Sequence, residues 1–279
     1  YGPPGTGKTT TIINLIHNFQ KKHNQLNKGL IIHLNASDER GIDIIRNQIN
    51  QFHSKLKPYM HTNNSLHSNI TVIPIKAFSD NYIWLIKDGN NAVLVDPGDA
   101  DPVLNYLSNN SLCLKAILVT HKHHDHIGGI INIKERFPNI KVYGPLNPSF
   151  NFEYTDVHES DSIKIEGTNL HFNVLETPGH TNDHIVYYNE ENLFCGDTLF
   201  GCGCGRLFEG TAEEMFNSLQ KLKMLKPSTK VFCAHEYTME NIRFAQSIIK
   251  NNSLLSQRFH KDKLKLNTLP TTIEVELTT

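Results

Sequence analysis

The chain has 279 residues, enough for one large domain or two small ones, with 38% hydrophobic and 20% charged residues. Its formal net charge of -1 gives no general attraction to nucleic acids or to membrane surfaces, so we expect neither as a partner. No apolar run of about eighteen residues appears, which argues against a membrane-spanning helix.

Cysteine usage bears on the compartment. Five cysteines, an odd number, in a chain of this length do not indicate a disulfide framework and favour a reducing compartment. We therefore expect a cytoplasmic protein. The chain begins at Tyr1 without an initiator methionine, so a targeting peptide stays open and the mitochondrion is the alternative.

A phosphate-binding loop pattern opens the chain. The segment GPPGTGKT fits G-x-x-x-x-G-K-[ST], in which backbone amides cradle phosphates, the lysine reaches the terminal ones and the last residue holds magnesium. The residues expected to bind ATP with magnesium are Gly2, Gly5, Gly7, Lys8 and Thr9. A helix, an apolar strand and a second helix follow, which together predict a partial α/β fragment over residues 1–52.

This fragment, with the stretch LNASDERGIDIIRNQI, resembles the start of a small subunit of replication factor C, an AAA+ clamp loader. The strand that precedes the loop in that family is absent, and no acidic strand end for magnesium follows before the fragment ends. We therefore expect little or no ATP hydrolysis by this part of the chain. Residues 53–69 are polar and lack periodicity, which predicts a linker.

From residue 70 onward, short β-rich runs with intervening helices predict a sheet sandwich covered by helices. Strands are expected at 70–75, 81–86, 92–96, 116–120, 170–176, 184–188, 193–197 and 230–235, and helices at 101–107, 127–137 and 211–225. The last of these helices opens on a capping box, Thr211 and Glu214, and is stopped by Pro227.

Histidines and an aspartate directly after an apolar strand form the most specific pattern in the chain. The segment THKHHDH places His121, His123, Asp125 and His126 just beyond the run AILV, at a sheet edge open to solvent and substrate. Three imidazoles and one carboxylate at this spacing suit a divalent ion such as zinc. The alternative is a solvated histidine-rich loop, which the interrupting carboxylate disfavours.

Three further strand ends supply side chains of the same kind: His180 in ETPGHT, Asp197 in FCGDTLF and His235 in VFCAHEY. Any one of them alone is more often a hydrogen-bonded structural residue than a metal ligand. Four strand-end loops that each carry such a side chain are difficult to explain by chance. The sequence therefore predicts one metal site assembled from all four loops.

The pattern H-x-H-x-D-H, followed by H, D and H, resembles the metallo-β-lactamase superfamily. That resemblance implies an α/β fold, the αβ/βα sandwich, with a two-metal site along one edge. It implies that one metal is held by His121, His123 and His180, that the other is held by Asp125, His126 and His235, and that Asp197 bridges them. Zinc is the expected metal, with iron and manganese as alternatives that the same ligand set accepts.

A closer resemblance is to glyoxalase II, the hydroxyacylglutathione hydrolase, over residues 70–279. It is carried by FSDNYIWLI, VDPGDA, THKHHDHIGG, TPGHTNDHI, CGDTLFGCGCGRLFEGT and CAHEYT. It implies hydrolysis of S-D-lactoylglutathione to D-lactate and glutathione, as in methylglyoxal catabolism. In such a site the metals supply a hydroxide that attacks the thioester carbonyl, with Asp125 and Asp197 as the catalytic residues.

Other side chains in these segments receive simpler interpretations. Cys202 and Cys204 are expected to be reduced thiols in a glycine-rich substrate loop, because the ligand set is complete without them. Asp183 is expected to be structural or to support the neighbouring ligand. Asp96 and Gly98 are expected to shape a loop, with the carboxylate able to orient a ligand imidazole.

The glyoxalase II resemblance also implies the substrate-binding residues, which here are Arg206, Phe208 and Tyr237. The arginine can pair bidentately with a glutathione carboxylate, whereas Phe208 lacks the hydroxyl that the family carries. The family continues into a basic segment beyond the point where this sequence ends. We therefore expect a hydrolase domain at 70–236, a truncated helical substrate-binding region at 237–279, and a raised KM with intact chemistry.

Three alternatives stay open: another hydrolase on the same fold, acting on a lactam, a phosphodiester or a different thioester; a nucleotide-binding clamp-loader module; and an inert fusion. Arg206 and Tyr237 favour glutathione, and the near-neutral charge disfavours a nuclease. We expect a monomer that acts on a small-molecule glutathione thioester.

Overall fold

The computed structural model describes residues 70–279 of the chain. These residues belong to one compact unit. The expected phosphate-loop residues and the linker at 53–69 lie outside the described residues, so ATP binding and the clamp-loader resemblance stay predictions. None of the described helices is long and apolar enough to cross a membrane.

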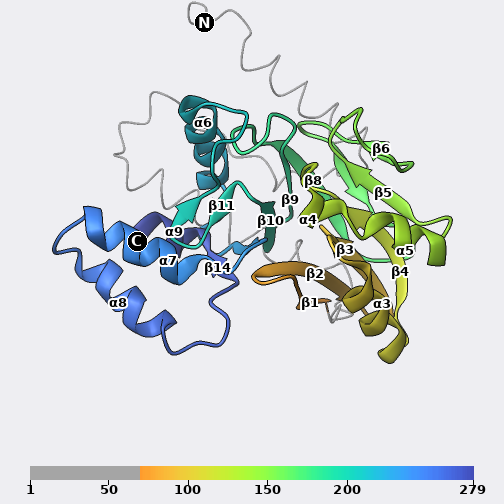
Figure 1. The fold of residues 1–279 in the computed structure, drawn as a ribbon, viewed down its shortest axis with the longest axis horizontal. Coiled ribbons are helices and arrows are strands. Elements are labelled where there is room, and N and C mark those ends of the chain that lie inside the picture. Colours follow the sequence, from red (N-terminus) through yellow and green to blue (C-terminus); the bar gives the residue numbers. More distant parts are fainter. Residues whose placement is uncertain (1–69) are drawn as a thin grey trace, which may run out of the picture. The chain divides into compact units, whose positions relative to one another are not determined.

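Two six-stranded sheets form the centre of this unit (Figure 1). The first contains, in spatial order, β1 (Ile70–Ala77), β2 (Asn81–Asp88), β3 (Asn91–Val95), β4 (Cys113–Leu118), β5 (Lys141–Gly144) and β6 (Thr155–Asp156). The first three strands are antiparallel, and β3 to β6 are parallel.

The second sheet contains, in spatial order, β14 (Thr271–Thr272), β13 (Lys230–Cys233), β10 (Asn192–Gly196), β9 (Ile185–Tyr188), β8 (His171–Glu176) and β7 (Ser162–Lys164). Only β10 and β13 pair in parallel; the other neighbours are antiparallel. A small hairpin, β11 (Leu199–Phe200) and β12 (Gly203–Cys204), follows β10.

Alternate side chains along each central strand of the first sheet enter two different cores. On one face, Trp84 and Ile86 of β2 pack in the cluster that also contains Phe172, Phe194 and Phe232 of the second sheet. On the other face, Ile83 and Leu85 pack in a cluster with residues of the covering helices. Because both faces are buried, these strands appear in the sequence as continuous apolar runs rather than alternating ones.

Helices cover the outer faces of the sheets. The helices α3 (Ala100–Asn109) and α5 (Ile130–Arg136) lie together against the first sheet, next to the short α4 (His124–Ile127) (Figure 1). Beyond the hairpin come α6 (Ala212–Lys223), α7 (Thr238–Ile248), α8 (Ser253–Asp262) and α9 (Ile273–Thr278). The sandwich expected from the sequence is therefore confirmed.

Several elements differ from the expectation. The helix expected at 127–137 is interrupted at Gly128 and Gly129, where an added Cβ would approach backbone atoms to within 2.8 Å. The region 237–279, for which a helical structure was expected, contains α7, α8 and α9, but it also contributes β14, which pairs with β13 of the second sheet. The capping box of α6 is confirmed, and this helix ends at Lys223, ahead of the proline.

The inter-sheet core generates a stability prediction. Phe194 is fully buried and stacks on Phe232 with ring centroids 5.0 Å apart, so Phe194→Ala is expected to lower the free energy of unfolding by about 3–5 kcal/mol. Denaturant titration measures this change. As a matched control, Phe216→Ala removes a ring that is 60% exposed on α6 and should stay within about 0.5 kcal/mol of the parent. Equal losses for the two variants would contradict the core assignment.

Candidate metal centre

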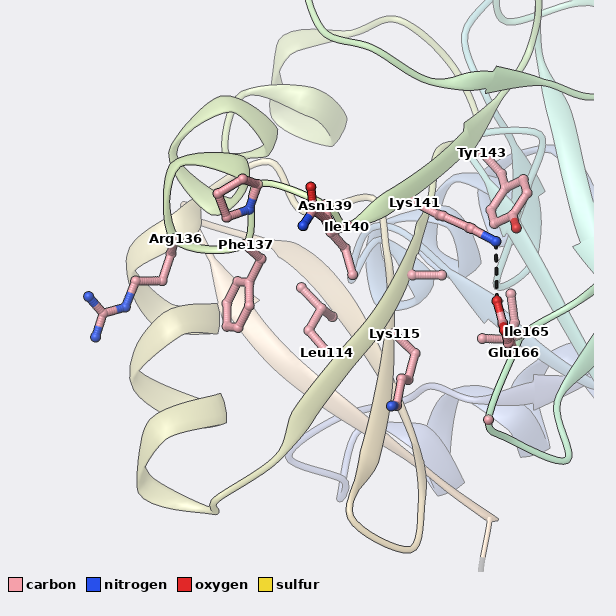
Figure 2. A pocket seen from close by; sticks show the side chains of 13 residues that line it. Leu114, Lys115, Arg136, Phe137, Asn139, Ile140, Lys141, Tyr143, Ile165 and Glu166 are labelled. Atoms are coloured by element: carbon pink, nitrogen blue, oxygen red, sulfur yellow. Dashed lines mark hydrogen bonds and ion pairs between the residues drawn. The ribbon is translucent and has the colours of Figure 1, made fainter.

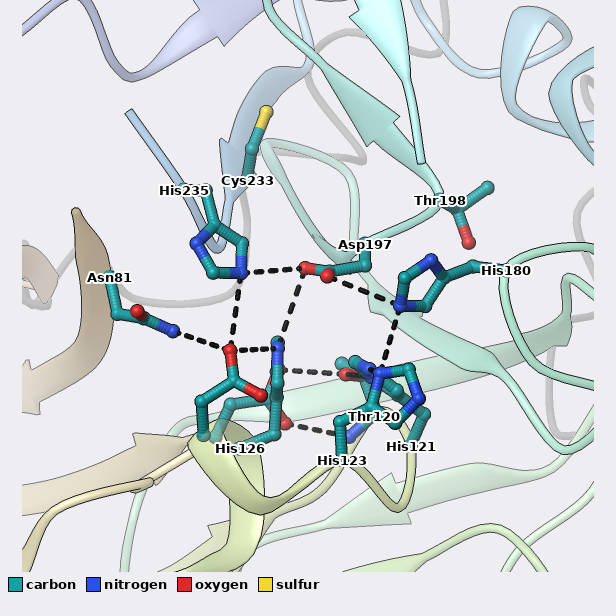
Figure 3. Close-up of polar contacts among 12 residues, drawn as sticks. Asn81, Thr120, His121, His123, His126, His180, Asp197, Thr198, Cys233 and His235 are labelled. Carbon is teal, nitrogen blue, oxygen red and sulfur yellow. Dashed lines mark hydrogen bonds and ion pairs between the residues drawn. The ribbon is translucent and has the colours of Figure 1, made fainter. Parts of the chain in front are cut away.

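Four loops at the carboxyl ends of strands bring the predicted ligands to one edge of the sandwich (Figure 3). The segment after β4 carries His121 and His123, and the short helix α4 that follows carries Asp125 and His126. The loops after β8, β10 and β13 carry His180, Asp197 and His235. Strands of both sheets end at this edge, so residues more than a hundred positions apart in the sequence meet there.

Three imidazoles form a first group. The Nδ1 atom of His123 lies 3.0 Å from Nε2 of His121 and 3.0 Å from Nε2 of His180. The Nε2 atom of His180 lies 3.3 Å from an Asp197 carboxylate oxygen. We call His121, His123 and His180 the three-histidine group.

Two imidazoles and a carboxylate form a second group. The Oδ2 atom of Asp125 lies 3.5 Å from Nε2 of His126 and 3.4 Å from Nε2 of His235. The Oδ1 atom of Asp197 is 3.4 Å from each of these nitrogens. We call Asp125, His126 and His235 the mixed group. Asp197 thus faces both groups, one oxygen toward each.

The spacing of these atoms fits metal coordination. Around a tetrahedral zinc ion with bonds of about 2.0–2.2 Å, neighbouring ligand atoms are about 3.3–3.6 Å apart. The separations in both groups are close to that range. Two of the buried atoms, Nε2 of His126 and Oδ1 of Asp197, have no hydrogen-bond partner within residues 70–279. The donor atoms, their spacing and these unpartnered atoms fit two divalent metals.

Outer partners decide which ring nitrogen of each ligand is free. His180 Nδ1 lies 2.7 Å from the backbone carbonyl of Arg206, an acceptor only, so it must carry the proton and leave Nε2 for a metal. His126 Nδ1 and His235 Nδ1 lie 2.9 Å and 2.8 Å from the carboxylates of Asp96 and Asp80. Such partners fix the tautomer and the ring orientation of a metal-binding histidine.

A short relay does the same for His121. The Thr120 hydroxyl lies 2.7 Å from Oδ2 of Asp96 and 3.0 Å from Nδ1 of His121. The hydroxyl has one hydrogen, which it donates in the hydrogen bond to the carboxylate. Its oxygen therefore accepts a hydrogen bond from the N–H at Nδ1 of His121. Asp96 therefore orients two ligand imidazoles, one directly and one through the threonine, as the sequence had suggested for one of them.

The electrostatics of the centre differ between its two groups. Burial, reinforced by the neighbouring imidazoles, holds the pKa of His121 well below its usual value. Burial raises the pKa of Asp197, but His126 and His235 outweigh this effect and lower it to about 2. Burial lowers the pKa of His235, but the nearby carboxylates of Asp125 and Asp197 raise it to about 10. The mixed group thus favours positive charge, which a divalent cation supplies.

His184 is a buried histidine that the sequence analysis did not single out. Its Nε2 accepts the backbone N–H of Asp197 at 3.1 Å, and its Nδ1 lies 3.0 Å from the hydroxyls of Thr177 and Thr198. Burial lowers its pKa to about 3, so the ring is neutral. Its ring also stacks on His121 at 4.7 Å. His184 thus supports Asp197 from beneath and does not belong to any of the ligand groups among the described residues.

Backbone conformation makes room for this arrangement. A Cβ at Gly98 would lie 1.8 Å from the backbone oxygen of Asp125, so the glycine allows the loop to approach the ligand segment. Asp96 has a φ of 52°, in the left-handed region that disfavours most side chains. Three hydrogen bonds, from the backbone and hydroxyl of Thr120 and from His126, hold it there.

The expected substrate-binding residues lie near the three-histidine group. The Phe208 ring, 58% exposed, meets the rings of His123 and His180 edge-on at 5.4 Å and 5.2 Å. The Arg206 guanidinium lies over that ring, 5.1 Å from its centroid. Tyr237 is placed differently, because its ring stacks on His235 at 4.8 Å beside the mixed group.

The simpler interpretations of the neighbouring side chains also have outcomes. All five cysteines are free, and neither Cys202 nor Cys204 joins a ligand group among the described residues. Asp183 accepts a hydrogen bond from Asn147 at 2.6 Å, so it anchors the 147 loop. The structure therefore favours the structural role that was one of the two expected for it.

A separate depression of about 670 Å³ lies at the amino ends of β4 and β5, away from the metal ligands at their carboxyl ends (Figure 2). Its rim includes Lys115, Arg136 and Lys141, and the last of these pairs with the exposed Glu166 at 3.4 Å. The Arg136 side chain extends away from the other lining residues (Figure 2). No group of metal-type ligands among residues 70–279 lies in it, so it is not the candidate active site.

Comparison with known proteins agrees with this geometry. The sequence model of the Metallo-beta-lactamase superfamily matches residues 78–235. A hydroxyacylglutathione hydrolase of Aliivibrio salmonicida is 51% identical over 207 residues, which cover 72% of this chain and 81% of that protein. The chain belongs to the hydroxyacylglutathione hydrolase family of the metallo-beta-lactamase superfamily.

Two solved structures resemble the described fold. ETHE1 from Myxococcus xanthus has a TM-score of 0.53 and 32% identity, covering 60% of this chain and 76% of that one. TTHA1623, solved in a di-iron-bound form, has a TM-score of 0.50 and 26% identity, covering 59% of this chain and 91% of that one. A protein with a fold similar to that of this chain is thus known in a di-iron-bound form.

The sequence analysis did not single out several residues that surround the ligands, because they lie outside the histidine and aspartate pattern that indicated the metal site. Asp80 lies in the turn before β2 and Asn81 is the first residue of that strand; Asn81 Nδ2 donates to Asp125 at 2.9 Å. Position was the available signal: Asp80 and Asn81 stand at the start of a buried strand, as His184 directly precedes β9. Nothing in the sequence indicated which ligand each would contact.

The position of Asp197 between the two ligand groups generates a prediction about metal content. Asp197→Ala removes the carboxylate that faces both groups, so we expect it to lower bound metal from about two ions per chain to one or none. Elemental analysis after removal of loosely bound metal measures the content.

The control is His124→Ala, which removes an exposed histidine from the same THKHHDH run. It should retain the metal content of the parent. Metal loss in the His124 variant, or two ions retained in the Asp197 variant, would contradict the ligand assignment.

Proposed function

We propose that this chain hydrolyses glutathione thioesters, with S-D-lactoylglutathione as substrate and D-lactate and glutathione as products. One observation carries the proposal: a two-metal ligand set at the sandwich edge lies directly beside the Arg206 and Phe208 segment, in a chain 51% identical to a hydroxyacylglutathione hydrolase. We assign catalysis to Asp125 and Asp197 together with the metals they hold.

Divalent metals bound here would activate water as a nucleophile near neutral pH and polarise the thioester carbonyl. The residues of the chain hold that chemistry in place. Asp197 presents one oxygen to each group, and its backbone N–H is fixed by His184. Asp125 is fixed from the other side by the amide of Asn81. No serine or cysteine nucleophile is needed, which agrees with the position of the cysteines outside the ligand groups.

Substrate binding is assigned to Arg206, Phe208 and Tyr237. The guanidinium of Arg206 is exposed and can pair with a glutathione carboxylate, while its planar face rests on Phe208. The Phe208 ring forms an apolar wall against two ligand imidazoles, next to the reacting thioester. Tyr237 supports His235 through ring stacking, so its contribution combines ligand support with substrate contact.

A salt bridge shapes the same rim. Glu209 accepts the backbone N–H of Asn182 at 2.9 Å and contacts the Lys122 ammonium at 2.5 Å. The substrate segment at 206–209 is thereby tied both to the loop of His180 and to the THKHHDH loop. These two contacts of Glu209 keep Arg206 and Phe208 facing the metal centre.

Zinc is the metal that we propose for both groups, since imidazole and carboxylate ligands at these spacings suit it, with iron and manganese as the alternatives. We further propose a cytoplasmic monomer, for which the five free thiols supply support. Size-exclusion chromatography with light scattering tests the monomer, and a dimer mass would contradict it.

The leading test of function is turnover of S-D-lactoylglutathione by the metal-loaded chain, followed by release of free thiol. We expect activity in the parent and in His124→Ala, and none detectable in Asp197→Ala. Turnover of a β-lactam or a phosphodiester at a higher kcat/KM than the thioester would replace the proposal with another hydrolase on this fold.

Arg206→Ala tests the binding assignment. Loss of one charge-assisted contact to the substrate is expected to raise KM about tenfold, with kcat nearly unchanged, because the metals and their ligands are untouched. Steady-state kinetics give both constants. Arg243→Ala, which removes an exposed arginine paired with Glu240 on α7, is the matched control and should leave KM unaltered. A fall in kcat with unchanged KM in the Arg206 variant would contradict a binding role.

A further inference from the structure

The outer partners of the ligand imidazoles differ in charge between the two groups. In the three-histidine group, His121 contacts the Thr120 hydroxyl and His180 contacts a backbone carbonyl, both of which are neutral. In the mixed group, both imidazoles contact carboxylates, at 2.9 Å for His126 and 2.8 Å for His235. The mixed group also contains a carboxylate ligand of its own, whereas the three-histidine group has none besides the shared Asp197.

The carboxylate that contacts His126 acts on both ligand groups. Asp96 accepts hydrogen bonds from the backbone and hydroxyl of Thr120 and from His126, so every contact that it makes requires an acceptor. Through the threonine it also reaches His121 of the other group. Asp96 therefore cannot by itself distinguish the two groups.

The carboxylate behind His235 serves one group only. Asp80 contacts His235 at 2.8 Å and makes no hydrogen bond to a ligand of the three-histidine group among the described residues. The turn that carries it is pinned to the His235 segment by backbone hydrogen bonds, from Glu236 to Asp80 at 3.0 Å and from Tyr82 to Ala234 at 2.7 Å. Its position beside the ligand is therefore fixed by the sheet and not by the side chain alone.

A carboxylate behind an imidazole affects metal binding in two ways. It makes the ligand nitrogen more basic, and it adds a negative charge that attracts a dication through a low-dielectric region. Both effects act on the mixed group and are weaker on the three-histidine group. The mixed group is thus expected to hold its metal more tightly.

We propose that the two metals load in a fixed order, the mixed group first, and that Asp80 is the positioning residue that sets this order. The inference concerns metal affinity and does not depend on which substrate the centre hydrolyses. It predicts that a chain with one equivalent of metal carries it at Asp125, His126 and His235, together with Asp197.

The test is a competition between metal-free protein and a chromophoric chelator for Co²⁺, from zero to two equivalents, which yields two dissociation constants. In Asp80→Asn the amide oxygen can still accept the His235 proton, so the change removes the charge and keeps the hydrogen bond. We expect the tighter dissociation constant to rise roughly 10–100-fold and the weaker one to stay within about threefold. The Co²⁺ absorption bands at one equivalent should shift as well.

Two comparisons assign the constants to the groups. His123→Ala damages only the three-histidine group and should keep the tight constant, whereas Asp125→Ala damages only the mixed group and should lose it. Asp88→Asn makes the same chemical change at a buried carboxylate that caps Asn169 at the far end of β2, and it should leave both constants unaltered.

Three results would overturn the proposal: equal weakening of both constants in Asp80→Asn, no weakening at all, or loss of the tight constant in His123→Ala. Thermal melting of each metal-free variant checks that the fold is retained. Because all readouts are metal affinities and Co²⁺ spectra, a chain inactive on S-D-lactoylglutathione still gives a decisive answer on loading order.

Discussion

The centre depends on holding several nitrogen and oxygen donor atoms close together with their lone pairs directed at one another. Five imidazoles and two carboxylates converge at separations of 3.0–3.5 Å, which is unfavourable unless cations neutralise the charge and the surroundings fix each ring. The ligands come from loops, and loops alone would not hold such a geometry. Rigidity comes from the two sheets, whose buried strands end within the same edge.

The outer partners of the ligands complete that rigidity. Four ligand imidazoles each donate a hydrogen bond to an outer partner, which leaves the opposite ring nitrogen free to bind metal. The partners are Asp80, Asp96, Thr120 and the backbone carbonyl of Arg206. The Arg206 contact has a second consequence. The residue whose guanidinium we propose to bind substrate also orients His180 through its backbone carbonyl, so the segment that carries Arg206 is hydrogen-bonded to a candidate metal ligand.

The C-terminal segment takes part in this support. Glu276 of α9 accepts the backbone N–H of Cys202 at 2.7 Å and pairs with the buried Arg258 of α8 at 2.6 Å. Cys202 has a φ of 58°, so the hydrogen bond holds an unfavourable conformation at the start of the substrate loop. The helices α8 and α9 therefore stabilise the loop that carries Arg206. The same C-terminal segment also contributes β14 to the second sheet.

The sequence alone determined the local structure and the kind of chemistry. Apolar runs of strand length located the central strands because both faces of those strands are buried, and the capping box located the start of α6. Histidines and aspartates placed directly after such runs indicated a metal site, since strand ends meet at sheet edges. Short edge strands such as β6 and β14 escaped notice because two residues carry no periodicity.

Only the tertiary structure decided how the ligands divide into groups and what stands behind each one. Asp80 and His235 are 155 positions apart, and no local pattern specifies that one carboxylate will face that imidazole rather than solvent. The same holds for His184 beneath Asp197 and for Tyr237 on His235. The reason is physical: periodicity reports which face of an element is buried, whereas contacts between loops depend on how the two sheets pack and twist against each other.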